Sequence, residues 1–319
     1  MNKVFRKKFA LFEIFAYLCK KNSSDMKDIA LVLSSGGARG LAHIGVIEEL
    51  ESRGYHITSI AGCSMGALIG GVYAAGKLTE FREWMKTIDR KKMLELTDFS
   101  LSLNHFVKGK RIIETIMEFV PDVAIEDLPI PYSAVAADLK EGREVVFSKG
   151  SLFEAIRASI SLPSFYEPVQ RDGMILIDGG VINPIPLNRV SRKTGDILVG
   201  ADVSGHDYKS QWEEMHRLTE WQKKDKSLKA KILDKLIPDN LEFNYYTVLS
   251  RTSSLMIRQN SILMTKLMNP DMLIDIQMSR YGGFDYDKSE KIIAIGRQKT
   301  AAALSKFEQN TKSQDYFLI

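Results

Sequence analysis

The chain has 319 residues, and 45% of them are hydrophobic, which is enough for one large folded core. Only two cysteines are present, Cys19 and Cys63, so a disulfide scaffold is excluded and a reducing compartment is favoured. The net charge is only +4, no repeat or low-complexity tract is visible, and we expect no nucleic-acid partner.

The charge is concentrated at the N-terminus. Residues 1–21 hold six lysine or arginine residues and a single acidic residue, Glu13. Apolar residues recur there every three to four positions, which predicts a basic amphipathic helix. Three interpretations remain open: a helix that binds a membrane, a helix that packs on the domain, and an export signal. The apolar run is too short to span a bilayer.

The first predicted strand covers residues 28–33 and leads into Ser34-Ser35-Gly36-Gly37-Ala38-Arg39-Gly40. A helix is expected from Leu41 to about Arg53. A glycine-rich turn at the start of a helix presents free backbone N–H groups near the positive end of the helix dipole. Such a turn binds anions, either a nucleotide phosphate or the oxyanion of an ester under attack.

The nucleotide interpretation lacks its usual companions. The dinucleotide fingerprint would require glycine where Ser35 stands and an acidic residue about 20 positions further on. No Gly-Lys-Ser or Gly-Lys-Thr follows the loop, which excludes a P-loop. The oxyanion interpretation is therefore favoured.

The second strand, predicted at residues 57–61, ends in Gly62-Cys63-Ser64-Met65-Gly66, and a helix is expected over residues 67–75. This G-x-S-x-G pattern between a strand and a helix is typical of a nucleophile elbow. In such an elbow a strained turn exposes the serine hydroxyl. Ser64 is thus the candidate nucleophile.

A third apolar strand, residues 174–177, places Asp178 at its end, before Gly179-Gly180. A carboxylate that follows an apolar strand is expected to be partly buried, and a buried charge needs a partner. The alternative is that Asp-Gly-Gly is an ordinary turn.

These motifs together resemble the patatin-like phospholipase family. The resemblance covers roughly residues 28–205, with a looser similarity at 270–305. It rests on SSGGARG at 34–40, GCSMG at 62–66, the segment ASISLPSFYEP at 158–168 and DGG at 178–180. The family's loop usually begins with glycine where this chain has Ser35.

The resemblance implies a three-layer α/β/α fold with a mostly parallel central sheet, and a Ser64–Asp178 dyad. In this scheme Asp178 accepts the proton of Ser64 as the hydroxyl attacks an ester carbonyl, with no cofactor and no metal. Arg39 is either an exposed residue of the helix start or a contact for a phosphate headgroup. The expected oxyanion donors are the backbone N–H groups of Gly36, Gly37, Ala38 and Arg39 and, by analogy with other elbows, Met65.

The five histidines agree with a dyad rather than a triad. His206 alone follows the late strands, where a triad histidine usually lies. His43 is expected to be a structural residue inside the helix after the glycine loop. We expect surface or helix-face positions for the others, His56, His105 and His216.

Residues 1–27 are treated as the N-terminal segment and residues 28–319 as one hydrolase domain, with a helical, partly basic excursion at about 207–268. A second basic stretch, residues 223–235, is either a solvated helix or a lid or membrane contact. Beyond it, Leu249, Met256 and Leu263, with Leu255 and Ile262 beside them, are expected to pack in the core or in a helix pair.

The sequence thus predicts a serine acyl-ester hydrolase of phospholipase A or lysophospholipase type, with a lipid substrate, most simply phospholipid at a membrane surface. We expect a cytoplasmic protein that attaches peripherally to the inner face of a membrane. Two alternatives remain: a catalytically weak, membrane-associated scaffold and a nucleotide-binding α/β protein.

Overall fold

The structure is a computed structural model that describes residues 27–89, 91–92, 110–163, 166–205, 245–278, 280–283 and 285–315. Several sequence-based predictions lie outside these residues: the N-terminal amphipathic segment, the basic stretch 223–235, His105, His206 and His216.

Strands and helices alternate along most of the described chain. The strands are β1 (Lys27–Leu33), β2 (Tyr55–Cys63), β3 (Tyr132–Asp138), β4 (Arg143–Phe147), β5 (Val169–Arg171), β6 (Met174–Asp178), β7 (Ile197–Asp202) and β8 (Met272–Asp275). The α-helices are α2 (Ala42–Ser52), α3 (Met65–Ala74), α4 (Leu78–Lys86), α6 (Lys110–Met117), α7 (Leu152–Ser159), α10 (Tyr245–Met268) and α11 (Ser289–Asp315). The described residues also form the 3-10 turns η1 (Gly37–Leu41), η2 (Ile125–Asp127), η3 (Gly179–Val181) and η4 (Tyr286–Lys288).

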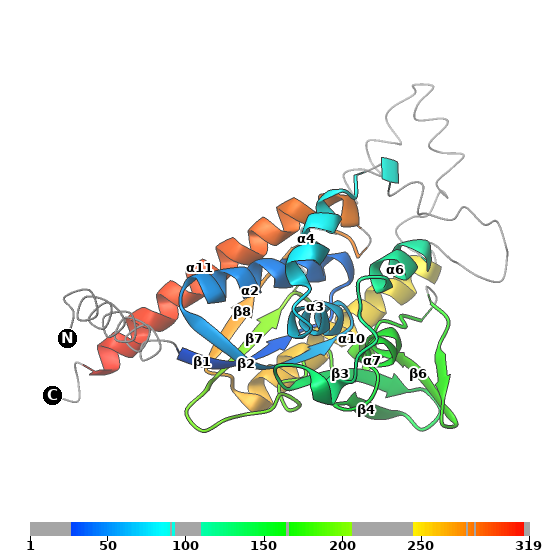
Figure 1. The fold of residues 1–319 in the computed structure, drawn as a ribbon, viewed down its shortest axis with the longest axis horizontal. Helices are drawn as coiled ribbons and strands as arrows, with labels where there is room; N and C mark the ends of the chain where they lie inside the picture. The colour runs from blue at the N-terminus through cyan, green and yellow to red at the C-terminus, as the bar shows by residue number, and fades with distance from the viewer. Residues whose placement is uncertain are drawn as a thin grey trace, which may run out of the picture.

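The eight strands form one sheet in the order β5-β6-β3-β2-β1-β7-β8, and β4 pairs with β3 (Figure 1). The pairs β3-β2, β2-β1, β1-β7 and β7-β8 are parallel, whereas β4 and β6 run antiparallel to β3. The carboxyl ends of the five parallel strands therefore lie along one edge, where ligand sites of open α/β sheets form.

Alternate residues of β1 face two different cores. Leu31 and Leu33 belong to the larger core, which also holds residues of α2, α3, α4, α7 and α11. Ala30 and Val32 face a smaller core on the opposite side of the sheet, against which Met264 and Met268 of α10 pack. Because side chains alternate along a strand, one buried strand separates two helical layers. The predicted three-layer α/β/α fold with a mostly parallel sheet is confirmed.

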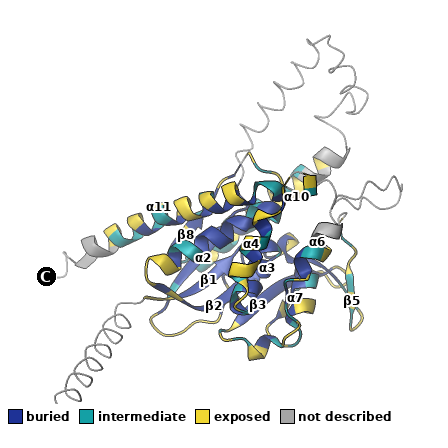
Figure 2. Cartoon of the chain, turned by 45° about the horizontal axis from the view of Figure 1, so that its top comes forward, coloured by how far each residue is buried: buried dark blue, intermediate teal, exposed yellow. Residues whose placement is uncertain are grey.

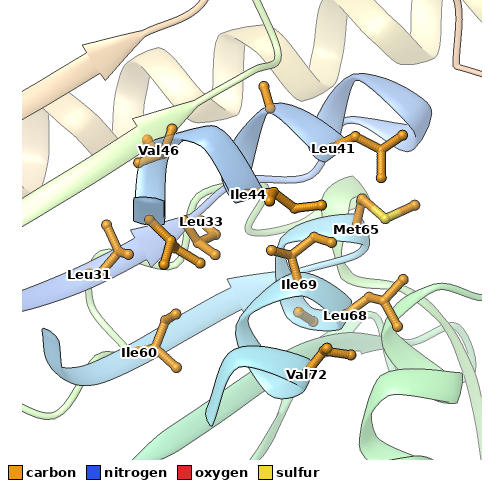
Figure 3. Packing of buried hydrophobic residues seen from close by; sticks show 14 of the residues in the cluster. Leu31, Leu33, Leu41, Ile44, Val46, Ile60, Met65, Leu68, Ile69 and Val72 are labelled. Carbon is orange, nitrogen blue, oxygen red and sulfur yellow. The ribbon is translucent and has the colours of Figure 1, made fainter. Parts of the chain in front are cut away.

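The larger core is dense where the first two βα units meet (Figure 3). Ile44 of α2 lies over Ile69 of α3, and Met65 closes the same apolar layer beside Leu41. All four are buried or nearly so, as are the central strands in Figure 2. This packing fixes the starts of α2 and α3, and both starts border the loops that hold the candidate site.

Local boundaries differ slightly from the prediction. The expected helix 41–53 is divided into the 3-10 turn η1 and helix α2, so helical geometry begins within the glycine loop. The helix predicted at 67–75 begins earlier, directly after Ser64. Both shifts place more N-terminal backbone N–H groups at the edge of the sheet.

The apolar stripe of α10 was predicted to pack in the core or in a helix pair, and the first of these is wrong for three of its residues. Leu255, Met256 and Leu263 are 47%, 60% and 62% exposed. The face of α10 that the sheet covers instead carries Ser261 and Arg258, which contact polar groups at the ends of β7 and β8. The apolar spacing correctly indicated a helix with one apolar face, but it did not show which face of that helix packs on the sheet.

Among the described residues, no helix combines the length and the apolar character required to cross a membrane.

Candidate active site

Ser64 lies at the junction of β2 and α3. Its backbone has φ 54° and ψ −124°, a conformation that residues other than glycine rarely adopt. The flanking glycines allow the turn, because a Cβ on Gly62 would lie 2.4 Å from the backbone of Gly66, and one on Gly66 would lie 2.2 Å from the carbonyl oxygen of Leu33. The predicted strand, tight turn and helix are present around GCSMG.

Asp178, the last residue of β6, accepts a hydrogen bond from the hydroxyl of Ser64. The Oγ of Ser64 donates to Oδ2 of Asp178 at 2.5 Å, and the N–H of Gly180 donates to Oδ1 at 2.8 Å. Asp178 is only 3% exposed. The expectation of a buried carboxylate with a partner is therefore met, and that partner is the candidate nucleophile.

Strand β3 explains why these two side chains meet. Val135 of β3 lies opposite Cys63 at the end of β2, and the next residue, Ala136, lies opposite Asp178 at the end of β6. Both β3 residues also pair with β4, which lies on the opposite side of β3. Strands β2 and β6 therefore lie on the same side of β3, one after the other along its length. Because β2 and β6 run in opposite directions, their last residues meet end to end, and the next residue after β2 is Ser64.

Burial changes the acid–base properties of the site. It raises the pKa of the Asp178 carboxyl from 3.8 to about 6, although hydrogen bonds from Ser64 and Gly180 act in the opposite direction. Such a carboxylate is ionised at neutral pH and is a stronger base than a solvated one. Burial, followed by the charge of Asp178, raises the pKa of the Cys63 thiol well above its ordinary value. The neighbouring cysteine therefore stays protonated, and Ser64 is the better nucleophile candidate.

The glycine loop lies beside the elbow, because a Cβ on Gly40 would meet the side chain of Met65 at 2.4 Å. Gly36, Gly37 and Met65 stand at the starts of η1 and α3, where backbone N–H groups have no acceptor within their own helix. The N–H of Ala38 donates to the carbonyl oxygen of Gly283 at 2.8 Å. Of the sequence-predicted donors, Ala38 is thus already engaged by a neighbouring segment.

Arg39 turns its guanidinium toward its own loop, since Nε donates to the carbonyl oxygen of Gly36 at 3.2 Å. Ser35, where the resemblance predicts glycine, donates its N–H to the carbonyl oxygen of Pro184 at 2.8 Å. Ser35 is not one of the residues with positive φ, so this position accepts serine without backbone strain.

His43 anchors the beginning of this loop. Its Nε2 lies 2.9 Å from the carbonyl oxygen of Ser34, and because a carbonyl only accepts, Nε2 carries the proton. Its Nδ1 has no hydrogen-bond partner among the described residues. Burial lowers the pKa of His43 to about 4, so the ring is neutral at physiological pH. The prediction of a structural histidine agrees with this position.

His56 is exposed and contacts Asp28, near the amino ends of β1 and β2. The candidate site lies at the carboxyl ends of these strands. In the part of the chain that the structure describes, neither His43 nor His56 hydrogen-bonds to Ser64 or Asp178.

Two residues at the site were not singled out from the sequence. The N–H of Ser64 donates to Oγ of Ser159 at 2.9 Å, and the N–H of Asp178 donates to the carbonyl oxygen of Ser161 at 2.9 Å. Both belong to the segment at 158–168, which the sequence analysis used only as part of a resemblance. The available signal is the pair of serines at the end of a short helix, since small hydroxyl side chains often bond to nearby backbone.

Both a family profile and individual known proteins are similar to this chain. The profile described as patatin-like phospholipase matches residues 31–190. An uncharacterized NTE family protein of Mycobacterium tuberculosis is 46% identical over 179 residues, which cover 56% of this chain and 50% of that protein. The neuropathy target esterase of Drosophila melanogaster is 32% identical over 186 residues, which cover 56% of this chain and 13% of that protein.

The chain thus spans about half the length of these mycobacterial relatives. Among solved structures, VipD from Legionella pneumophila aligns with 88% of this chain and 67% of its own, at 15% identity and a TM-score of 0.44. That likeness is too distant to support a structural argument.

Proposed function

Because the chain belongs to the patatin-like phospholipase family, we propose that it hydrolyses acyl esters of lipids with Ser64 as its nucleophile and Asp178 as its base. The observation that carries the proposal is the 2.5 Å hydrogen bond from Ser64 to a buried carboxylate, made from a strained elbow. This pairing is the one that nucleophilic catalysis requires, since the base lies within reach of the proton that it removes.

In the first half of the reaction, Oγ of Ser64 attacks the ester carbonyl carbon while its proton passes to Oδ2 of Asp178. The carbonyl oxygen becomes an oxyanion, and we assign its stabilisation to backbone N–H groups of Gly36, Gly37 and Met65. The N–H of Arg39 is a further candidate, whereas that of Ala38 would first have to leave the carbonyl of Gly283. Loss of one such donor costs about 10² to 10³ in kcat in a comparable site.

The tetrahedral intermediate then collapses. The bond between the former carbonyl carbon and the alcohol oxygen breaks, and Asp178 returns its proton to the leaving alcohol. A water molecule next attacks the acyl-enzyme, again with Asp178 as base, and releases the fatty acid and free Ser64. A base with a pKa near 6 suits both directions of this proton transfer at neutral pH.

The substrate is proposed to be a phospholipid at a membrane surface, cleaved in the manner of a phospholipase A or a lysophospholipase. Arg39 at the loop is the candidate for a phosphate contact, because its guanidinium lies beside the proposed oxyanion donors. The basic N-terminal segment is the candidate membrane contact.

The experiment is hydrolysis of mixed phospholipid and lysophospholipid vesicles by purified full-length protein, with all released fatty acids and lysolipids identified by mass spectrometry. Ser64→Ala is compared with Ser305→Ala, which removes an exposed hydroxyl that bonds only within α11. We expect Ser305→Ala to match the wild type and Ser64→Ala to release no product above the uncatalysed rate.

Activity that survives in Ser64→Ala would contradict the elbow assignment. A wild-type protein that binds the vesicles and cleaves none of these lipids would contradict the proposal and favour the scaffold alternative.

A further inference from the structure

Ser159 makes two hydrogen bonds that leave its hydroxyl no freedom. It is fully buried at the end of α7, where its Oγ donates to the carbonyl oxygen of Val135 at 2.6 Å and accepts the N–H of Ser64 at 2.9 Å. A hydroxyl has one proton to donate. Because Val135 takes it, a lone pair of Oγ remains directed at the N–H of the nucleophile.

The residue at the other end of this bond is the strained one. Ser64 has φ 54°, and an elbow of this kind persists only where its surroundings hold it. The N–H of Ser64 is the backbone donor of the strained residue itself. An acceptor fixed at 2.9 Å opposes rotation of this peptide toward the ordinary negative-φ region, which would swing Oγ away from Asp178.

The same short turn also holds the base. The carbonyl oxygen of Ser161 accepts the N–H of Asp178, and the hydroxyl of Ser161 is fixed by Arg157 through bonds of 2.6 and 2.8 Å. Gly179 packs so closely on β3 that a Cβ would lie 2.3 Å from the carbonyl oxygen of Val135. Val135 is thus a shared support for Ser159 and for the backbone after the base.

We propose that Ser159 is a positioning residue that holds Ser64 in its reactive conformation, and that the turn 159–161 sets the Ser64–Asp178 geometry. This inference rests on the proposed function. It also assigns the Ser64 N–H to the scaffold, so the oxyanion must be bound by N–H groups of other residues.

Ser159→Ala removes the acceptor and leaves Ser64, Asp178 and the glycine loop chemically unchanged. We expect kcat to fall between about tenfold and 10²-fold, the scale on which small misplacements of reacting groups act. KM should stay within about twofold, and the rate of Ser64 labelling by a fluorophosphonate should fall in parallel with kcat. Ser159→Thr keeps the hydroxyl and should recover part of the lost kcat.

Ser133→Ala is the matched control. Ser133 is also buried, lies on β3, and donates its hydroxyl to a backbone carbonyl, that of Arg189 at 2.9 Å. The Ser133→Ala substitution removes the same kind of hydrogen bond, a hydroxyl bonded to a backbone carbonyl, at a position whose hydroxyl bonds to Arg189 rather than to the elbow. A comparable loss of thermal stability in the two alanine variants, with a loss of kcat only in Ser159→Ala, would separate positioning from general destabilisation.

The outcomes are distinct. A kcat of Ser159→Ala within twofold of the wild type would overturn the inference and leave the proposed function intact. An equal loss of kcat in Ser133→Ala would overturn it as well. If Ser159→Ala does not fold, Ser159→Cys replaces it, because sulfur is a weak acceptor of similar shape, and the same kcat and KM criteria apply. Full activity of Ser64→Ala would remove the proposed function and this inference together.

Discussion

Asp178 combines two properties that oppose each other. Its burial raises the energy of its charged form, which makes the carboxylate a stronger base and at the same time lowers the stability of the folded state at neutral pH. The hydrogen bonds from Ser64 and Gly180 to its oxygens reduce this cost without removing it. Catalytic and structural consequences of the same carboxyl can therefore be measured separately.

Asp178→Asn should lower kcat by at least about 10²-fold, because the amide keeps the shape but cannot accept the serine proton. In the wild type, kcat/KM should rise with pH through an apparent pKa near 6, since only the ionised carboxylate is a base. The check is a steady-state pH profile on a soluble ester. Asp172→Asn, the same substitution at an exposed turn, is the control and should leave activity unchanged. A wild-type profile flat from pH 5 to 8 would contradict the role given to Asp178.

Asp178→Asn should also stabilise the protein above pH 7. Between its unfolded pKa of 3.8 and its folded pKa of about 6, Asp178 binds a proton in the folded state that the unfolded state has released. Wild-type stability therefore falls as pH rises through this interval, by at most about 3 kcal/mol. The variant lacks this loss, so its advantage should be largest above pH 7 and vanish below pH 4.

Because His43 also titrates in this pH range, the quantity to measure is the difference in stability between the wild type and Asp178→Asn. Burial lowers the pKa of His43 to about 4, so its contribution to stability has the opposite slope in the same pH range. Both proteins contain His43, and it cancels in the comparison. Thermal unfolding at pH 4, 6 and 8 supplies the data, and an advantage of the variant that grows toward low pH would contradict the raised pKa of Asp178.

At the scale of elements, local patterns predicted more than long-range contacts. The strand, turn and helix around Ser64 follow from the spacing of apolar residues and glycines within about twenty positions. Ser159 bonds to Ser64 across 95 residues, and Gly283 reaches Ala38 from a still more distant segment. No local pattern encodes such contacts. The pairing of Ser64 with Asp178 was predicted only through the family resemblance, because it depends on where β2 and β6 end along β3.

Helix α10 shows the same limit. Its stripe of leucine and methionine predicted packing in the core or in a helix pair, yet the side of α10 that faces the sheet carries Arg258 beside Met264 and Met268. Arg258 donates to the buried Asp202 at 2.7 Å and to Asp275 at 3.3 Å, which ties α10 to the ends of β7 and β8. The spacing of apolar residues does not show whether the apolar face of a helix lies against the sheet or against solvent. In α10 the buried ion pair of Arg258, and not the apolar stripe, lies on the face that meets the sheet.

Arg258→Ala should therefore destabilise the fold by about 3 kcal/mol, because it leaves the buried Asp202 carboxylate without its partner. Arg297→Ala, which breaks a more exposed pair with Glu48 on α2, should cost less than about 1 kcal/mol. Urea unfolding of both variants gives the comparison. Equal effects of the two substitutions would contradict the anchoring role of Arg258.

At the scale of the whole molecule, the proposed function requires the protein to bring Ser64 and Asp178 to a lipid that stays in a membrane. The basic segment 1–21 is the candidate anchor, since each basic residue near an anionic surface contributes about 1 kcal/mol. Deletion of residues 1–21 should reduce activity on anionic vesicles far more than on a soluble short-chain ester. Vesicle sedimentation at low and high salt checks the attachment, which salt should weaken. Equal sedimentation of both forms in all conditions would favour a segment that packs on the domain.

The central claim is that Ser64 is the nucleophile, and the most direct measurement is the site of covalent labelling. Wild-type protein is treated with a fluorophosphonate, digested, and mapped by mass spectrometry, with Ser64→Ala and Asp178→Asn treated in parallel. The account predicts one modified peptide that contains Ser64, no labelling in Ser64→Ala, and much slower labelling in Asp178→Asn. Stoichiometric labelling at another serine, or undiminished labelling of Ser64→Ala, would contradict it.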